Sequence, residues 1–322
     1  MKKLEELTHL LSNELSFIDL PASPPNLYDP LRYFLTLGGK RIRPILTLLG
    51  AELFNVKADK AIPAALAVEV FHNFTLIHDD IMDEAPLRRN KATVHHKWNQ
   101  NIAILSGDVL FVKAYQLIAK QDPKHLPDLI QLFNKTAIEV CEGQQMDMDF
   151  ESREDVSIVE YIEMIRLKTS VLLGCALELG AIIANASEND RKYLYDFGQH
   201  IGIAFQIQDD ILDLYADPEK FGKQVGGDVI ANKKTLLNIK GFSLANDEQK
   251  TELKSLYNSS DFNHKVARTR ELYTLVGART SCEEEMQKHY NQAMKAIAEI
   301  SVDEDRKSDL IQLADSLMVR IS

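Results

Sequence analysis

Two short acidic segments of identical form stand out in the chain. Residues 79–83 read Asp-Asp-Ile-Met-Asp and form the first box, and residues 209–213 read Asp-Asp-Ile-Leu-Asp and form the second box. On a helix, residues four apart project from one face, so the first and last carboxylates of each box point the same way. Carboxylates this close repel one another unless cations neutralise them. A solvated helix end explains one such box, but two boxes favour a cation site.

Carboxylate oxygens favour Mg²⁺ or Mn²⁺ over zinc, and Mg²⁺ in proteins binds one or two carboxylates together with substrate phosphates. We therefore expect two facing acidic helices that hold a diphosphate through bridging metal ions. Basic residues that could complete the anion site lie mostly in short predicted loops at or just beyond helix ends, and binding and catalytic residues are often found on such loops. These residues are Lys40, Arg43, Arg88, Arg89, Lys168, Lys223 and Lys233. His72 precedes Asp79 by about two helical turns and so shares its face, although a lone helical histidine is more often structural.

Composition excludes several classes of protein. The 322 residues carry a formal net charge of −11, which argues against nucleic acid or an anionic membrane surface as the main partner. The three cysteines (Cys141, Cys175 and Cys282) form no C-x-x-C pair and are interpreted as packing thiols in a reducing compartment. The first residues lack the apolar region of a signal peptide, and no uninterrupted apolar run approaches the ~20 residues that span a bilayer. A cytoplasmic protein without a membrane span is expected.

The elements that must position these residues are predicted to be helices. Apolar residues recur at helical spacing and nowhere at sustained period 2, so we predict an all-α fold, with residues 1–322 as a single domain. Ser157 and Glu160 form a capping box at a helix start, and Ser187 to Asp190 is a second cap before the helix of the second box. Asp29-Pro30 predicts the start of a short helix that ends at Gly38-Gly39.

These motifs together resemble the trans-isoprenyl diphosphate synthases, the family of farnesyl and geranylgeranyl diphosphate synthases. The resemblance runs from about residue 38 to 235 and rests on motifs in a fixed order: Gly-Gly-Lys-x-x-Arg at 38–43, the first box with Arg88-Arg89, Gly-Gln-x-x-Asp at 143–147, Lys168-Thr169, Phe205-Gln206 before the second box, and Lys223 with Lys233. The family implies an all-α bundle around a deep central cavity, usually homodimeric, that uses Mg²⁺. Asn90 stands where the family more often has glycine, and only a local loop difference is expected.

The resemblance also implies a role for each matching residue. The residues implied to bind the metal ions are Asp79, Asp83 and Asp209. Those implied to hold the allylic diphosphate are Arg88, Lys168, Lys223 and Lys233. Those implied to hold isopentenyl diphosphate are Lys40, Arg43, His72 and Arg89. Thr169 and Gln206 are implied to lie beside the developing carbocation, and together with Lys168 they are the implied catalytic residues.

The implied reaction is a head-to-tail prenyl transfer. Metal ions and cationic side chains stabilise the negative charge on the departing diphosphate, so the allylic C–O bond ionises. An apolar cavity keeps water from the cation. The double bond of isopentenyl diphosphate then attacks, and loss of a proton gives a chain five carbons longer. The expected product is a short all-trans prenyl diphosphate of fifteen to twenty carbons, with twenty preferred.

Product length depends on the helix before the first box. In the family, the residue five positions before the first aspartate helps set the cavity floor, and bulky aromatic residues there resemble short-chain enzymes. Here that residue is Phe74, followed by Thr75. Helix geometry does not demand this role, because five residues turn a helix ~140° from Asp79 whereas Thr75 lies almost beneath it. Core packing explains Phe74 equally well.

Three alternatives remain open. A longer-chain polyprenyl diphosphate synthase would carry the same motifs. A class I terpene cyclase shares the first acidic box but usually has an Asn/Ser/Glu metal box in second place, whereas this chain repeats the aspartates. A non-catalytic synthase subunit would not need both boxes and the basic residues intact. Incubation with isopentenyl diphosphate, each allylic primer and Mg²⁺ separates the three.

Overall fold

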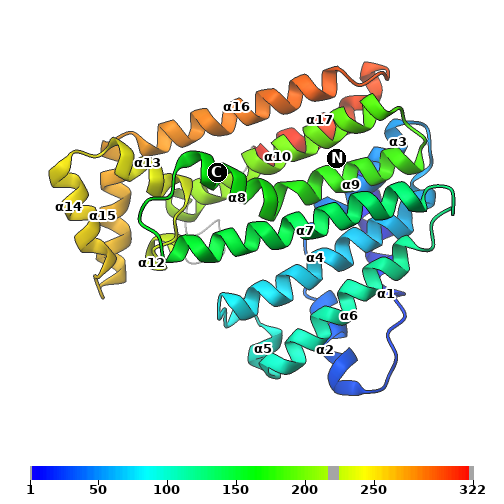
Figure 1. Cartoon of the computed structure of the whole chain (residues 1–322), viewed down its shortest axis with the longest axis horizontal. Helices are drawn as coiled ribbons and strands as arrows, with labels where there is room; N and C mark the ends of the chain where they lie inside the picture. The colour runs from blue at the N-terminus through cyan, green and yellow to red at the C-terminus, as the bar shows by residue number, and fades with distance from the viewer. Residues whose placement is uncertain (1, 217–224, 319–322) are drawn as a thin grey trace. The chain divides into compact units, whose positions relative to one another are not determined.

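Helices make up most of the structure, which is a computed structural model and describes residues 2–216 and 225–318 (Figure 1). The α-helices in these ranges are α1 (Lys2–Ser16), α2 (Pro25–Leu35), α3 (Ile42–Leu53), α4 (Ile62–Met82), α5 (Val94–Lys97), α6 (Gln100–Ile118), α7 (Leu126–Glu151), α8 (Ile158–Ile165), α9 (Val171–Ile183), α10 (Glu188–Tyr215), α12 (Gly227–Ile230), α13 (Leu236–Leu244), α14 (Asp247–Tyr257), α15 (Phe262–Leu275), α16 (Ala278–Ala298) and α17 (Glu304–Met318). Shorter elements are the 3₁₀ turn η1 (Ala58–Ala61), the π-helical turn η2 (Arg166–Ser170) and the strands β1 (Leu87–Arg88) and β2 (Lys91–Ala92). The prediction of an all-α fold is confirmed, and the deep cavity stays a prediction.

The chain divides into two compact units, each assembled from several segments. Unit 1 comprises Met1–Lys135, Cys175–Tyr195 and Ser301–Leu310, and unit 2 comprises Thr136–Gly174, Asp196–Ile300 and Ile311–Ser322. Helices α7, α9, α10 and α17 contribute residues to both units. The expected single domain over residues 1–322 stays a prediction.

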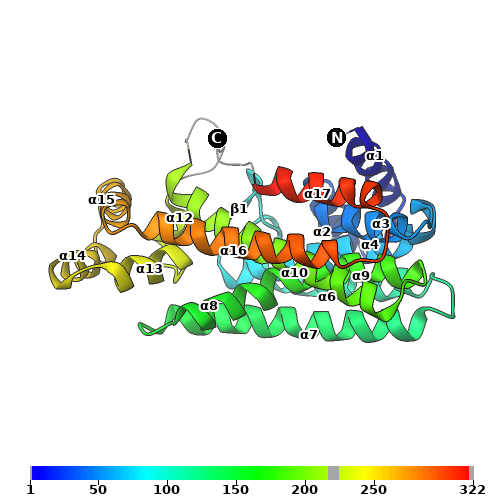
Figure 2. The ribbon, with the colours of Figure 1, turned by 90° about the horizontal axis from the view of Figure 1, so that it is seen from above.

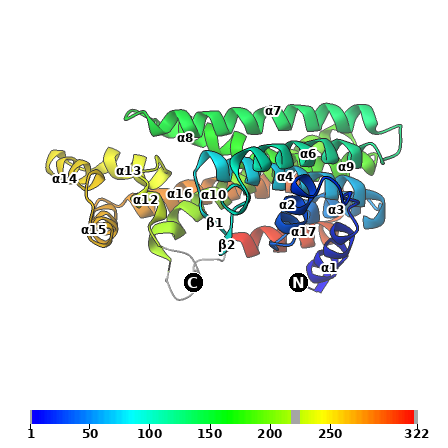
Figure 3. The same cartoon turned by 90° about the horizontal axis from the view of Figure 1, so that it is seen from below.

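Unit 1 is organised around α4 and α6, which run side by side (Figures 1 and 3). The first half of α4 carries alanines 64, 65 and 67, all fully buried, so neighbouring helices can approach it closely. Farther along, Phe71 and Ile77 are each 1% exposed. Burial of a large apolar side chain stabilises a fold by roughly 1.5–3 kcal/mol, so this apolar helix is a rigid base for the first box.

Unit 2 has its own hydrophobic core along the second half of α10. Residues Ile203, Ile207 and Ile211 recur at helical spacing and are buried against α8 and α13. Helix α16 lies alongside α10 (Figure 2), where the Nδ1 atoms of His200 and His289 are 3.1 Å apart. The second box therefore stands on a helix whose apolar face is fixed by packing.

The histidine pair predicts a pH-dependent stability. His289 is 6% exposed, and burial, together with His200, lowers its pKa from 6.5 to about 4. Between these values the unfolded chain binds a proton that the folded chain does not. The free energy of unfolding therefore falls as the pH drops from about 6.5 to about 4, by up to about 3 kcal/mol.

The measurement is urea unfolding of wild type and His289→Gln at pH 7.5 and pH 4.5. The variant should lose distinctly less stability between these pH values, because glutamine does not titrate. Equal losses in the two proteins would contradict a role of this pair. Acidic side chains that titrate in the same range are common to both proteins and cancel in the comparison.

Of the local sequence predictions, the helix caps agree with the structure, whereas one helix start and one cysteine do not. The capping box of Ser157 and Glu160 is confirmed at the start of α8, and Ser187 Oγ accepts a hydrogen bond from the Asp190 backbone N–H at the start of α10. The predicted start at Asp29-Pro30 is wrong: α2 begins at Pro25, which also suits a first helical position, and Pro30 lies inside the helix with its side chain buried. Cys141 is exposed, so its interpretation as a packing thiol is wrong, whereas Cys175 and Cys282 are buried.

Two helical segments are long and apolar enough to cross a membrane by length and composition. They are Ala58–Met82 and Gln100–Ile118, and 61% and 39% of their most apolar windows are buried inside the structure. Core helices of proteins that never enter a membrane meet the same criteria. The expectation that no segment spans a membrane therefore stays a prediction.

Candidate active site

Both acidic boxes lie at the C-terminal ends of long helices. Asp79 is in the last turn of α4 and Asp83 is its C-cap residue, while residues 209–213 occupy the last turns of α10. Neither helix has a basic residue in its last turn. Because the helix dipole places partial negative charge at this end, each box adds anions where they are least stable. Bound cations would offset this cost.

In unit 1, the predicted basic residues gather around His72 in the middle of α4. Arg43, in the first turn of α3, has its guanidinium nitrogen 3.2 Å from His72 Nε2. Burial lowers the pKa of His72 well below 6.5, and the guanidinium groups of Arg43 and Arg89 lower it further. The neutral ring therefore accepts the hydrogen bond of Arg43. The exposed Lys40 lies three residues before Arg43.

A tight hairpin follows the first box and carries Arg88 and Arg89. Strands β1 and β2 pair antiparallel (Figure 3), and the two residues that join them, Arg89 and Asn90, have φ of 52° and 60°. Positive φ at both positions is typical of a type I′ turn, and asparagine tolerates it better than most residues. Asn90 thus adopts a backbone conformation that glycine, the residue more common here in the family, also adopts. The expectation that this replacement changes only the local loop stays a prediction.

The hairpin places the two arginines in different surroundings. Arg88 donates from Nε to Asp80 Oδ1 at 2.8 Å, and the Asp80 side chain is 1% exposed. Burial raises the pKa of Asp80, and Arg88 opposes that rise. Arg89 donates to the Gly38 carbonyl, which joins the turn to the Gly-Gly-Lys segment. Asp80 is therefore a buried ion-pair partner of Arg88. The contact expected between Arg88 and the allylic diphosphate stays a proposal.

A buried ion pair that sequence reasoning missed supports this basic group. Arg41 donates to Glu69 on α4, and their side chains are 7% and 4% exposed. Asn73 Nδ2 donates to the same Glu69 oxygen at 3.0 Å. Arg41 has φ of 51°, so the pair holds the residue between Lys40 and Arg43 in an uncommon backbone conformation.

Removal of one partner of this pair should destabilise the fold strongly. Glu69→Ala leaves Arg41 buried without its carboxylate, and the expected loss is about 3–5 kcal/mol in the free energy of unfolding. Glu69→Gln keeps an oxygen acceptor and should cost less. Urea unfolding curves of the two variants and wild type measure both losses. A loss below about 1 kcal/mol for Glu69→Ala would mean that water replaces the carboxylate.

In unit 2, the predicted Lys168 and Thr169 lie in the π-helical turn η2, an element frequently found at functional sites. Two glycines let neighbouring helices approach this turn. A Cβ on Gly143 of α7 would lie 2.2 Å from the Lys168 nitrogen, and one on Gly202 of α10 would lie 2.7 Å from Ser170 Cα. The Gly-Gln-x-x-Asp motif therefore brings α7 against η2, a role that the sequence alone did not reveal.

This close packing connects the predicted residues by hydrogen bonds. Lys168 Nζ lies 2.6 Å from Asp147 Oδ2, one helical turn beyond Gly143. Thr169 Oγ1 donates to Gln206 Oε1 at 3.2 Å, and Gln206 Nε2 donates to Asp210 Oδ1 at 3.2 Å. Thr169 and Gln206, the two residues predicted to lie beside the carbocation, are thus hydrogen-bonded to each other within unit 2.

Carboxylates crowd the end of α10. Burial, together with the nearby charges of Asp213, Asp147 and Asp209, raises the pKa of Asp228 to about 7, although Lys233 opposes the shift. Burial and the charge of Asp228 raise the pKa of Asp210, and the hydrogen bonds donated by Tyr161, Gln206 and the Leu236 backbone N–H oppose that rise. Such mutual repulsion is what bound cations relieve.

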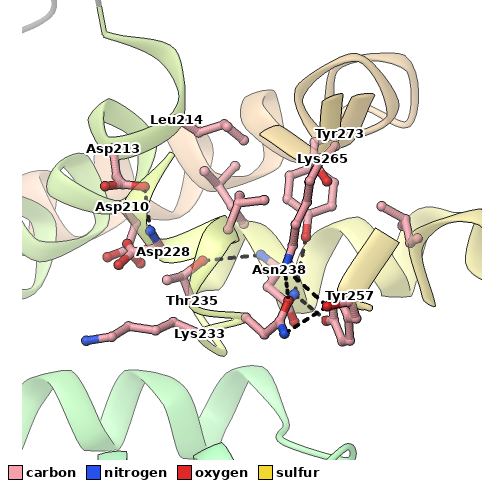
Figure 4. A pocket seen from close by; sticks show the side chains of 15 residues that line it. Asp210, Asp213, Leu214, Asp228, Lys233, Thr235, Asn238, Tyr257, Lys265 and Tyr273 are labelled. Atoms are coloured by element: carbon pink, nitrogen blue, oxygen red, sulfur yellow. Dashed lines mark hydrogen bonds between the residues drawn. The ribbon is translucent and has the colours of Figure 1, made fainter. Parts of the chain in front are cut away.

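A pocket of about 410 Å³ lies beside this carboxylate group (Figure 4). At one end the Asp228 backbone N–H donates to Asp213 Oδ2 at 3.0 Å. At the other end the buried Lys265 donates to Asn232 Oδ1 at 2.7 Å, to the Ile230 carbonyl at 3.1 Å and to the Tyr257 carbonyl at 3.3 Å. These three acceptors use every ammonium proton, so Lys265 fixes the segment between Asp228 and Lys233.

A second pocket, of about 480 Å³, joins the predicted residues of unit 2 to this segment. It is lined by Asp147, Tyr161, Met164, Ile165, Lys168, Thr169, Gln206, Asp210, Asp228, Lys233, Lys234 and Thr235. Its wall thus offers lysine ammonium groups and oxygen atoms side by side. That combination suits a phosphate-bearing ligand accompanied by cations.

The carboxylate oxygens of this site fit magnesium in chemistry. Within residues 2–216 and 225–318, no three acidic, histidine or cysteine side chains converge closely enough to hold a metal ion. Magnesium usually keeps several waters and binds through one or two carboxylates plus substrate phosphates. The repulsion that raises the pKa of Asp228 supplies a reason for cation binding.

The remaining predicted residues fall as follows. Phe74 stacks on Phe111 of α6 with ring centroids 5.0 Å apart, and Thr75 Oγ1 donates to the His72 carbonyl at 2.9 Å. Lys233 is partly buried and precedes α13. Lys223 lies outside the described residues. The roles of all these residues stay proposals.

Comparison with known proteins places these features in context. The family model described as polyprenyl synthetase matches residues 24–276. A geranylgeranyl pyrophosphate synthase of Geoglobus acetivorans is 36% identical over 319 residues, 98% of each chain, and a geranylgeranyl diphosphate synthase of Methanosarcina mazei is 42% identical over 247 residues, 75% of this chain and 76% of that one. The crystal structure of geranylgeranyl pyrophosphate synthetase from Pyrococcus horikoshii matches with a TM-score of 0.93 and 35% identity, over 99% of this chain and 98% of that one.

Proposed function

The chain belongs to the polyprenyl synthetase family, and from this premise we propose that it condenses isopentenyl diphosphate head to tail with allylic diphosphates. The proposed product is an all-trans prenyl diphosphate of twenty carbons, the product in the names of the relatives from Geoglobus acetivorans and Methanosarcina mazei. The observation that carries the proposal is the 480 Å³ pocket in which Lys168, Thr169 and Gln206 meet Asp228 and Lys233.

Each group of side chains would perform one step. Lys168 and Lys233 would bind oxygens of the allylic diphosphate, with Arg88 and Lys223 as further contacts. The oxygens of Thr169 and Gln206 would face the allylic carbon, where positive charge develops. Lys40, Arg43, His72 and Arg89 would hold isopentenyl diphosphate; His72 is neutral, so it accepts from Arg43 and holds that guanidinium in place.

Magnesium is the proposed cofactor. The residues proposed to hold it are Asp79, Asp83 and Asp209, and it would supply the positive charge that stabilises diphosphate as a leaving group. A direct measurement is the thermal unfolding midpoint with Mg²⁺ and inorganic diphosphate, added separately and together. The midpoint should rise most with both, because a ligand that binds only the folded state stabilises it.

The test of the function is one set of incubations. Purified protein, Mg²⁺ and isopentenyl diphosphate are combined with dimethylallyl, geranyl or farnesyl diphosphate, and the products are separated by chromatography. Accumulation of a twenty-carbon prenyl diphosphate supports the proposal. Longer products would identify a longer-chain synthase, cyclic hydrocarbon a terpene cyclase, and binding without turnover a non-catalytic subunit.

The protein is further proposed to be a cytoplasmic homodimer. On α6, Leu105 and Val112 lie two helical turns apart on one face and are 58% and 56% exposed. Apolar side chains exposed in this way suit a subunit interface. Light scattering of the purified protein would give twice the chain mass, and Leu105→Lys would reduce that mass if this face is the interface.

A further inference from the structure

The second aspartate of the second box has surroundings unlike those of a metal ligand. Asp210 is 4% exposed, and three donors engage its carboxylate. Tyr161 of α8 donates its hydroxyl to Oδ2, the Leu236 backbone N–H donates to Oδ2 at 3.3 Å, and Gln206 Nε2 donates to Oδ1 at 3.2 Å. Asp210 therefore acts as an acceptor shared by three elements.

This acceptor determines which way the Gln206 amide points. The amide nitrogen of Gln206 is the atom that contacts Asp210 Oδ1, and this contact leaves the amide oxygen on the side away from Asp210. With Nε2 on Asp210, Oε1 accepts from Thr169 Oγ1 at 3.2 Å. Tyr161, Asp210, Gln206 and Thr169 all line the same 480 Å³ pocket.

We propose that Tyr161 and Asp210 are positioning residues that hold the Gln206 amide with its oxygen toward Thr169 and the reacting allylic carbon. The inference rests on the proposed prenyl transfer. An amide oxygen directed at developing positive charge stabilises it, whereas an inverted amide presents N–H groups and opposes it. Tyr161 anchors the arrangement because its ring is 2% exposed and packs within the core of unit 2.

The first test is Tyr161→Phe, which removes the hydroxyl and keeps the ring. The expected result is a fall in kcat of roughly tenfold or more, with KM for both substrates changed less than about threefold, since the residue acts on the cation and not on diphosphate binding. The matched control is Tyr290→Phe, which removes another tyrosine–aspartate hydrogen bond, from Tyr290 on α16 to Asp315. That variant should keep the wild-type kcat.

A double-mutant cycle separates positioning from general packing. If Tyr161 acts through Gln206, then Tyr161→Phe should lower kcat in the wild-type background but not in Gln206→Leu. An equal loss in both backgrounds, or an unchanged kcat for Tyr161→Phe alone, would overturn the inference. If Tyr161→Phe does not fold, Asp210→Asn takes its place in the same cycle, because its NH₂ group would turn the Gln206 amide around.

Different results would overturn the proposed function and the positioning roles of Tyr161 and Asp210. Wild-type protein that forms no prenyl diphosphate from any allylic primer would overturn the proposed function, and this inference with it. Wild-type protein that elongates normally, while Tyr161→Phe behaves like Tyr290→Phe, would overturn only the positioning roles of Tyr161 and Asp210.

Discussion

Asp79→Ala is expected to lower kcat for chain elongation roughly a thousandfold while leaving the fold intact. If Asp79 is a metal ligand, as proposed, its loss removes several kcal/mol of stabilisation from the departing diphosphate, and each ~1.4 kcal/mol is a factor of ten in rate. Stability should not fall in parallel. Asp79 is one turn from Asp83 at the negative end of the α4 dipole, so its removal relieves repulsion.

Two measurements on the same samples test this prediction. Single-turnover assays report the rate, and thermal unfolding reports both stability and the shift produced by Mg²⁺ with inorganic diphosphate. For Asp79→Ala, the single-turnover rate and most of the ligand-induced rise in the thermal unfolding midpoint should be lost. The midpoint measured without ligand should stay at the wild-type value. Asp59→Ala, which removes an exposed carboxylate in η1 just before α4, is the charge-matched control and should retain all three. An Asp79→Ala protein with near wild-type kcat would refute a metal role for the first box.

Residues that depend on nearby sequence were predictable here. Three features involve residues only a few positions apart: the Asp-Asp-x-x-Asp boxes, the capping box at Ser157 and the helical period. Because helix geometry fixes how such close residues lie, the sequence alone predicts their arrangement. The start of α2 failed because Pro25 and Pro30 both suit a helix start. Burial of Pro30, Leu31 and Phe34 decided between them, and that burial depends on the rest of the fold.

Residues that support the candidate site through distant partners could not be found in this way. Arg41 and Glu69 are 28 positions apart, Tyr161 and Asp210 are 49 apart, and Lys265 reaches a carbonyl 35 positions away. Apart from Asp210, which belongs to the second box, each partner alone looks like an ordinary surface or core residue. The one local clue was a charged side chain within an otherwise apolar helix, as Glu69 is on α4. It predicts a buried partner without naming it.

Phe74→Ala is expected to shift the product from twenty carbons toward longer chains. Phe74 stacks on Phe111 at 5.0 Å and contacts Phe71 at 5.5 Å, so α4 and α6 present an aromatic barrier about one and a half turns before Asp79. Removal of the ring opens space that a further five-carbon unit could fill. Thr75→Phe adds bulk almost beneath Asp79 and should shift the product toward fifteen carbons.

Core packing is the competing explanation of Phe74, and one control separates the two. Phe133→Ala removes a fully buried ring that contacts Phe71 and Tyr115 in the same aromatic cluster. Both truncations should cost about 3–5 kcal/mol in the free energy of unfolding if Phe74 serves packing alone, with an unchanged product distribution in each. If Phe74 also limits the chain, chromatography will show longer products for Phe74→Ala and not for Phe133→Ala. Stability and product length then vary independently, as expected of a residue whose ring borders the space that the growing chain must enter.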